Sequence, residues 1–425
     1  MSARRRLDDV RGHCGLPDSQ WSDDTSRVTL ESAPNAMLDP AGPAPVGSDV
    51  PPAQRSRATI AWTVLGVALF LLLSAAILAA NAIANLRFDA AIAAHRVAVA
   101  DAASAGESTA TVEADAGVTA EIAASMLAAP DALVDPAAKA TFSTAAGALG
   151  SVIEAAPATD FAAPTRPMSR PIWFADLDRA SSVLAAESER LDAEAAAAEA
   201  HAVELAAADQ ATADSGMAFL EAVAPVAASV EAANGSARNI ERIEYRNSVE
   251  LLSSGVTWGF DASARLDEYV AAAAALQSTH AAEEAEKAGP LYDRRIAVEA
   301  YARSIAGGVL LEFDWAPMVI GYGDNGSAGG TATWDTWEGG LSTITLSNSI
   351  AEQWGDPIMA ALVTHEVGHA ITSKCYDLVG EYANDNEPWA VAWAIGQGYT
   401  DPNGNGEWLY GHPPDELIER SKGCR

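Results

Sequence analysis

No charged side chain occurs between Arg57 and Arg87, and alanine, leucine, isoleucine and valine dominate this stretch. At a rise of about 1.5 Å per residue, a helix from Ala58 to Ala80 would be about 35 Å long. Such a helix is long enough to cross a hydrocarbon core of about 30 Å. The run therefore predicts a single transmembrane helix within residues 58–86, because soluble proteins rarely bury a helix that is apolar on all sides.

A cleaved signal peptide is the alternative interpretation of this run. Residues Ala80, Asn81 and Ala82 have the small-x-small form of a cleavage site. However, the run is longer than the apolar core of a signal peptide and follows a long polar tail. We therefore expect the segment to remain as an anchor.

The orientation of the anchor is indicated by arginines and cysteines. The nearest arginines are balanced, with two before and two after the run, but the tail contains more of them and favours a cytoplasmic N-terminus: Arg4, Arg5, Arg6, Arg11 and Arg27. Cys14 is alone on this tail, whereas Cys375 and Cys424 form an even pair beyond the run. An extracellular disulfide needs such a pair, and two unpaired thiols are the alternative. We expect a single-pass protein of the cell membrane, with its N-terminus cytoplasmic and its C-terminal domain extracellular.

The formal net charge of the chain is -32. A nucleic acid or an anionic membrane surface would repel a chain this acidic. We therefore expect no nucleic-acid partner, and contact with the membrane only through the one transmembrane helix.

Composition divides the rest of the chain into segments. Residues 1–57 are rich in proline and polar residues, and predict a disordered cytoplasmic tail. Residues 87–289 are dominated by alanine and predict a helical stalk or bundle with a proline-rich break at 157–171. This stalk would act as a spacer or, alternatively, as a ligand-sensing bundle, and an oligomer could form through it.

Residues 290–425 contain most of the 11 tryptophans and therefore predict a packed core. Hydrophobic periodicity predicts a helix over 291–306 and a strand hairpin over 331–347. Residues 308–323, between them, predict either a pair of strands or one strand with an irregular exit. Asp356 and Pro357 then form an N-cap and first-turn pair that opens another helix. The predicted fold class is α+β, with a small sheet and an active-site helix.

That last helix contains the stretch "VTHEVGHAI". His365 and His369 are four residues apart, so they lie on one face and can bind one metal ion through imidazole nitrogens. Glu366 lies about 100° around the helix, where it cannot bind the same ion but can take a proton from a metal-activated water. Gly368 in mid-helix costs about 1 kcal/mol relative to alanine, which suggests that another element approaches closely. The alternative is a buried helix whose histidines are satisfied by polar neighbours.

The stretch resembles the active-site helix of the zincin metallopeptidases, and the resemblance extends over residues 291–424. It implies a zinc ion (Zn2+), a peptide or protein substrate, and Glu366 as general base. In this family a strand that precedes the helix, often at the sheet edge, binds the extended substrate. The residues 342–347 occupy that place in the sequence.

The resemblance also indicates the third ligand. The metzincin branch would require Gly at 372 and His or Asp at 375, but the chain has Thr372 and Cys375. The gluzincin branch has an Asn-Glu pair at the start of a second helix, which Asn386 and Glu387 match. Glu387 is therefore the expected third ligand. The alternatives are three nearby acids, Asp377, Glu381 and Asp385.

Gluzincins also carry an aspartate four residues after the ligand glutamate, which supports a ligand histidine. Val391 stands there in this chain, and Asp385 could provide the support instead. A tyrosine or histidine that stabilises the oxyanion is expected as well. The candidates are Tyr399, Tyr410 and His412, of which His412 is preferred.

The sequence as a whole predicts a membrane-anchored zinc metalloendopeptidase. The alternative is a cell-envelope scaffold or sensor whose zinc-binding domain does not hydrolyse peptides. An intact base at Glu366 favours the enzyme, because a binding module has no need of one.

Overall fold

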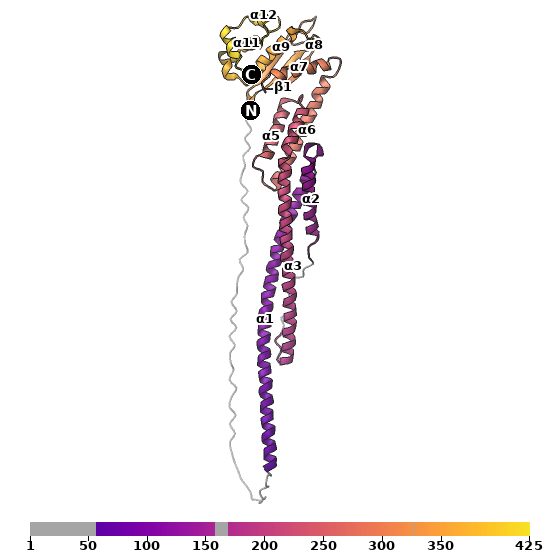
Figure 1. Ribbon diagram of the computed structural model, residues 1–425, viewed down its shortest axis with the longest axis vertical. Helices are drawn as coiled ribbons and strands as arrows, with labels where there is room; N and C mark the ends of the chain where they lie inside the picture. Colours follow the sequence, from indigo (N-terminus) through magenta and orange to yellow (C-terminus); the bar gives the residue numbers. More distant parts are fainter. Residues whose placement is uncertain (1–56, 158–168, 325) are drawn as a thin grey trace, which may run out of the picture. The chain divides into compact units, whose positions relative to one another are not determined.

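The computed structural model describes residues 57–157, 169–324 and 326–425. The predicted disordered tail, Cys14 and most of the predicted proline-rich break lie outside the described residues. The chain divides into two compact units, Met1–Leu73 and Ser74–Arg425. Helices predominate among the described residues and a small sheet accompanies them, so the predicted α+β class is confirmed (Figure 1).

Two helical stretches are long and apolar enough to cross a membrane by length and composition: Ala61–Leu127, within α1 (Arg57–Leu127), and Phe174–Ala233. The most apolar window of the first is not buried at all, whereas a third of the second is buried. The predicted span is thus the first part of a longer, unbroken helix. Candidate membrane-spanning helices therefore exist in the chain.

The remaining helices before residue 290 form a bundle: α2 (Pro136–Glu154), α3 (Phe174–Glu221), α4 (Val223–Ala233), α5 (Asn239–Ser253) and α6 (Phe260–Glu286). The helical stretch over 174–233 is interrupted at Ala222, between α3 and α4. Pro225 explains the interruption, because it has no N–H to donate to the carbonyl of Glu221. The segment between α5 and α6 contains two glycines with positive φ, Gly255 and Gly259.

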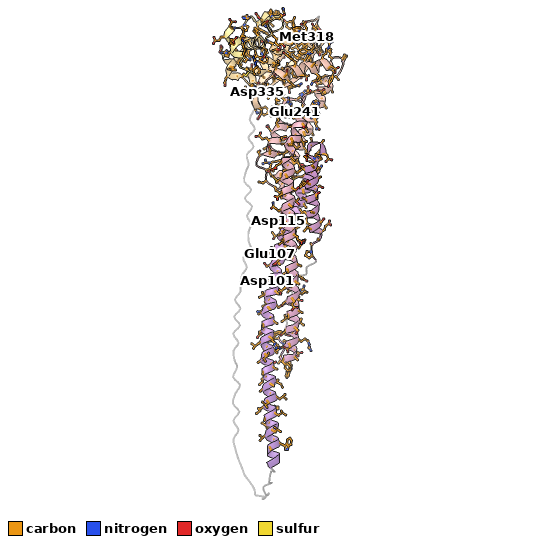
Figure 2. All side chains as sticks on the ribbon, in the orientation of Figure 1. Asp101, Glu107, Asp115, Glu241, Met318 and Asp335 are labelled. Carbon is orange, nitrogen blue, oxygen red and sulfur yellow. A yellow bond between two sulfur atoms is a disulfide. The ribbon has the colours of Figure 1, made fainter. Side chains whose placement is uncertain are left out.

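Small side chains pack the long helices closely. On α1, Ala102 and Ala105 are buried against α3, whereas Asp101, Glu107 and Asp115 are exposed (Figure 2). The broader end of the bundle has an aromatic core that includes Phe142, Phe219, Tyr245 and Tyr269.

The C-terminal part contains three strands, β1 (Leu310–Ala316), β2 (Gly330–Asp335) and β3 (Leu341–Ser347). Its helices are α7 (Tyr292–Ile305), α8 (Asn348–Glu352), α9 (Pro357–Ala370), α10 (Tyr376–Val379), α11 (Glu387–Gly396), α12 (Glu407–Tyr410) and α13 (Asp415–Ser421). The predicted helix over 291–306 and hairpin over 331–347 correspond to α7 and to the β2–β3 pair.

The strand order is β1-β3-β2. β3 pairs in parallel with β1 and antiparallel with β2, for example Ile344 with Phe313 and with Ala332. The expectation that residues 342–347 form a sheet edge was therefore wrong, because both edges of β3 are already hydrogen bonded. The edge strand of this hairpin is β2.

The helix α9 lies between the sheet and α11. Val363 and Val367 pack with Ile344 and Trp393 in one core. A Cβ at Gly368 would lie 2.9 Å from the Cα of Ala390 in α11, closer than real Cβ atoms approach. The expected close approach at Gly368 is confirmed.

Polar contacts join the bundle to the C-terminal part within the second unit. Lys287 Nζ lies 3.0 Å from Glu299 Oε2, and both side chains are buried. The backbone N–H of Asn239 donates to Glu312 Oε2 of β1 at 2.8 Å, and its side chain donates to the carbonyl of Ser342. The predicted boundary near 290 is thus crossed by buried interactions.

The predicted pairing of Cys375 and Cys424 is present as a disulfide, with a Cα–Cα distance of 6.0 Å. The indole of Trp393 donates to the carbonyl of Cys424 at 3.1 Å. The C-terminus is therefore fixed near the end of α9.

Candidate metal centre

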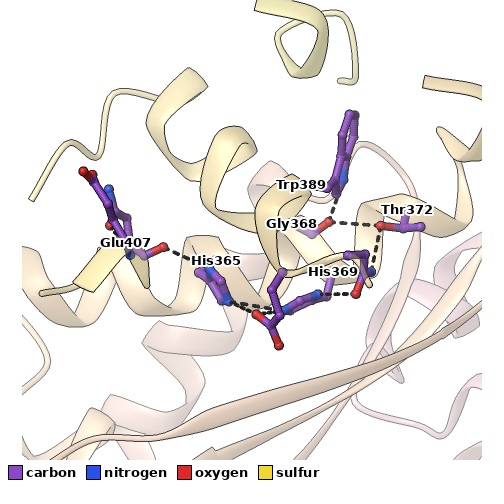
Figure 3. Close-up of polar contacts among 9 residues, drawn as sticks. His365, Gly368, His369, Thr372, Trp389 and Glu407 are labelled. Atoms are coloured by element: carbon purple, nitrogen blue, oxygen red, sulfur yellow. Dashed lines mark hydrogen bonds and ion pairs between the residues drawn. The ribbon is translucent and has the colours of Figure 1, made fainter. Parts of the chain in front are cut away.

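The start of α9 is set by the predicted N-cap. The Asp356 carboxylate accepts from the N–H of Ile358 at 3.0 Å, and Pro357 occupies the first turn. Two turns later the helix presents His365 and His369 on one face, with ring centroids 4.8 Å apart. Figure 3 shows the two imidazoles turned toward each other.

Glu387, the first residue of α11, faces these imidazoles. Its Oε2 lies 3.1 Å from His365 Nε2 and 3.2 Å from His369 Nε2, and the two Nε2 atoms are 3.1 Å apart. Within the described ranges, this is the group of three side chains placed to hold a metal ion. The alternative acids do not join it, and Glu381 instead lies 3.3 Å from Arg420.

The protonation of both rings follows from their second nitrogens. His365 Nδ1 lies 2.9 Å from the carbonyl of Asn405, which can only accept, so this nitrogen carries a proton. His369 Nδ1 lies 3.0 Å from Asn386 Oδ1, whose amide group donates to Thr372. When Nδ1 carries the only ring proton, the lone pair of each Nε2 is therefore directed toward Glu387.

This arrangement fits a zinc ion. Three lone-pair atoms at 3.1–3.2 Å would repel one another unless a proton or a metal cation lies among them. In a tetrahedral zinc site with bonds of about 2.0–2.1 Å, ligand atoms are about 3.3 Å apart. Two imidazoles with one carboxylate are also a common ligand set of catalytic zinc.

The charges around the site favour a cation. Burial lowers the pKa of His369, but hydrogen bonding to Glu387 and the charge of Glu366 outweigh burial, and the pKa is raised. Burial raises the pKa of Glu387, but hydrogen bonds with His365 and His369 outweigh it, and the pKa falls far below its usual value. The site thus stabilises positive charge between the rings and negative charge on Glu387.

Glu366 is buried beside this group, and burial raises the pKa of its carboxyl. Its Oε2 has no hydrogen-bond partner among the described residues. A Cβ at Gly330, the first residue of β2, would lie 2.6 Å from Glu366 Oε1. Glycine at this position therefore allows β2 to approach Oε1 of Glu366. The other oxygen, Oε2, remains available to a ligand.

A cleft of about 350 Å³ opens next to His365 and Glu366. Its walls come from α9, from the segment before β2 and from the loop around α12. Most of the larger side chains that line it are apolar or aromatic: Ile320, Tyr322, Ile358, Met359, Leu362, Trp408, Leu409 and Tyr410. The cleft can therefore accommodate an apolar group beside the metal ligands.

Of the three expected oxyanion residues, the structure brings Tyr410 to the cleft. Its ring stacks parallel to that of His365 with centroids 5.8 Å apart. Burial, and then the Glu387 carboxylate, raises the pKa of Tyr410 to about 12. The phenol is therefore protonated at neutral pH and can donate a hydrogen bond.

The other two candidates lie elsewhere. His412 is not part of the cleft lining, and its Nδ1 lies 3.0 Å from Glu407 Oε1 on the surface. Tyr399 accepts from Tyr301, which bonds Thr364 of α9. Tyr399 thus supports the helix rather than the cleft, and the preference for His412 has no support in this geometry.

The expected support of a ligand histidine by Asp385 is also not found. Asn386 and the backbone of Asn405 provide it instead. Asn386 belongs to the recognised Asn-Glu pair and could have been assigned this role. The contribution of Asn405 is a backbone carbonyl, which no sequence motif marks.

Comparisons of the chain with protein-family models, with curated proteins and with solved structures find no match. Its function is therefore inferred from the chemistry of the site.

Proposed function

We propose that the protein is a zinc-dependent metallopeptidase anchored in a membrane by one helix. The observation that carries this proposal is the convergence of His365, His369 and Glu387 beside Glu366, whose Oε2 has no hydrogen-bond partner among the described residues. These three residues would hold zinc. When bound, zinc supplies a Lewis acid for a carbonyl oxygen and lowers the pKa of water.

Glu366 is the proposed general base. Its partnerless Oε2 can accept a proton from water, and the raised pKa of its carboxyl favours keeping that proton. The same group can then donate the proton to the leaving amine. One buried carboxyl thus serves both proton transfers of peptide hydrolysis.

Tyr410 is the proposed oxyanion donor. It stacks on a ligand imidazole, lines the cleft and keeps its proton at neutral pH. A neutral donor placed where negative charge develops stabilises the transition state.

The proposed binding site for the peptide backbone is the outer edge of β2. β2 pairs with β3 on one side, and its first residue, Gly330, lies against Glu366. An extended peptide could add to the other side by backbone hydrogen bonds. The apolar cleft would then receive a large apolar side chain of the substrate.

The single membrane span is proposed for the first part of α1. The apolar residues of the competing stretch are explained by the bundle, since Phe219, Leu220 and Val223 are buried in its core. The disulfide between Cys375 and Cys424 supports an oxidising compartment for the C-terminal part, and hence a cytoplasmic N-terminus.

The test is cleavage of a fluorogenic peptide library by the full chain, purified in detergent and loaded with zinc. Glu366→Gln should retain the metal, because Glu366 is not a ligand, but lower kcat by roughly a thousandfold through loss of the base. Glu416→Gln, an exposed change on α13, is the matched control and should cleave like the wild type. Zinc-loaded wild type that binds peptides without cleaving any would contradict the enzyme and favour the scaffold.

A further inference from the structure

The first residues of α3 expose an apolar patch that the proposed function does not use. Ile172 is 83% exposed and Trp173 is 65% exposed, and Phe174 is also exposed. We call residues 172–174 the α3 patch. A tryptophan so exposed next to two other large apolar residues needs a partner to cover it.

The position of the patch is fixed by the pairing of α3 with α1. The two helices run side by side in the same direction, since Arg87 pairs with Asp178 and Thr109 Oγ1 lies 3.3 Å from the carbonyl of Ala198 (Figure 1). Near the start of α3, Leu177 packs with Ala84 and Phe88 of α1. The α3 patch is therefore level with α1 residues just before Ala84.

Arg170 anchors the segment that carries the patch. It donates to Asn85 Oδ1 at 2.9 Å and pairs with Asp89 at 3.0 Å, and its guanidinium lies over the ring of Phe88. The patch is thus held against α1 from both sides, by Arg170 before it and by Leu177 after it.

The level of the patch coincides with a change in the surface of α1. Before it, Leu78 and Ile83 are exposed and apolar. Beyond it, charged side chains begin with Arg87 and Asp89 on α1. This is the level at which a helix that crosses a membrane leaves the hydrocarbon, and tryptophan is enriched at that boundary.

We infer that the α3 patch inserts into the interfacial layer of the lipid bilayer and gives the protein a second membrane contact. The inference rests on the proposed span in α1. Its support is the level of the patch, which lies where the exposed apolar residues of α1 end and its first charged residues, Arg87 and Asp89, begin. Along the helix axis, apolar residues are followed by a tryptophan and then by charged residues, which is the order of the layers of a bilayer. Contact with a second copy of the chain would not require this order.

The test measures depth in the membrane with single labels on the full chain. Cysteines at Leu72, Trp173 or Val203 are introduced in a Cys14→Ser background, with the disulfide intact, and carry an environment-sensitive nitrobenzoxadiazole. The protein is reconstituted in phosphatidylcholine vesicles that contain lipids spin-labelled near the headgroup or deep in the chain. Val203 is the control, because it is 70% exposed on the same helix but lies about 45 Å further along it.

The label at 173 should be quenched at least twofold more by the shallow spin label than by the deep one. The label at 72 should show the opposite order, and the label at 203 should be quenched by neither. Quenching at 72 without quenching at 173 would overturn the second contact while the span stands. Absence of quenching at 72 would contradict the span itself, and this inference with it.

A label-free measurement guards against insertion driven by the probe. Trp173→Phe keeps the patch apolar but removes one emitter. The difference between the wild-type and Trp173→Phe emission is the emission of Trp173. Lipids brominated near the headgroup should quench this difference. If the emission assigned to Trp173 is insensitive to brominated lipids, the patch does not contact the bilayer.

Discussion

At the scale of single residues, the two candidates on either side of Gly411 differ in what surrounds them. Tyr410 packs against His365 in the cleft, whereas the imidazole of His412 faces solvent and Glu407. Only the first can reach a group that reacts at the metal ligands. Two residues that are close in the sequence therefore differ in whether they can act at the candidate metal centre.

Replacement of Tyr410 by phenylalanine should lower kcat by roughly a hundredfold and leave KM nearly unchanged, because a donor to the transition state is lost. The ring, and with it the stacking on His365, is retained. His412→Ala should change kcat by no more than about twofold, as expected for a surface substitution. Steady-state kinetics on the best library peptide measure both, and a larger loss for the His412 variant would refute the assignment.

The sequence predicted which ligands come together but not the donor beside them. Helical periodicity places His365 and His369 on one face, whereas Glu387 was assigned from the Asn-Glu pair of the resemblance, and the structure brings the three together. Tyr410 is the last residue of α12, a four-residue helix that is too short to show a hydrophobic periodicity. The path of the chain before this helix depends on close packing of Gly404 and Gly406 on α9, where a Cβ would meet Ala361 and His365.

At the scale of elements, the approach of α11 to α9 determines where Glu387 lies. Gly368 permits it, and the indole of Trp389 donates to the carbonyl of Gly368 at 3.0 Å. The close packing at Gly368 and the hydrogen bond from Trp389 thus hold together the two helices that carry the candidate metal ligands.

Gly368→Ala should destabilise the protein by about 1–3 kcal/mol, because the new methyl group would meet the backbone of Ala390. Gly147→Ala is the matched control, since nothing lies within 4 Å of its added Cβ on α2. This change should be neutral or stabilise by up to about 1 kcal/mol through helix propensity. Denaturant unfolding measures both, and equal stability of the two variants would show that the contact at Gly368 is loose.

Element types were more predictable than their arrangement. The alternation in β2 and β3 identified a hairpin, and Asp356 with Pro357 identified the start of α9. The strand order was missed because the parallel pairing of β1 with β3 joins distant segments, and alternation does not say which neighbour a strand takes.

At the scale of the whole molecule, the bundle and the candidate metal centre belong to one compact unit. The buried pair of Lys287 and Glu299 and the docking of Asn239 on the sheet cross the boundary that composition suggested. Composition shows that the alanine-rich part of the chain ends near residue 290 and that a tryptophan-rich part follows. It does not show which helices pack against each other across this boundary. Experiments on the site therefore require the full chain.

Removal of the disulfide should weaken the unit that contains the site. Cys375→Ser with Cys424→Ser opens a loop of sequence separation 49 and should lower the free energy of unfolding by about 4 kcal/mol in the chain-entropy model. The control is Cys14→Ser, which should leave stability unchanged. The denaturant midpoint should shift more in the double variant than in the control. Equal shifts would exclude a stabilising role of the disulfide.

The central claim is that His365, His369 and Glu387 together hold one zinc ion, and chelator competition with elemental analysis of the full chain tests it most directly. The wild type should bind one equivalent of zinc, and Glu387→Ala should weaken affinity by at least about a hundredfold, since a direct ligand is lost. Asp385→Ala, which removes a neighbouring acid outside the group, should lose less than about tenfold, below the usual loss for supporting residues. Folded wild type without stoichiometric zinc, or a Glu387 variant that binds zinc as tightly as wild type, would contradict the account.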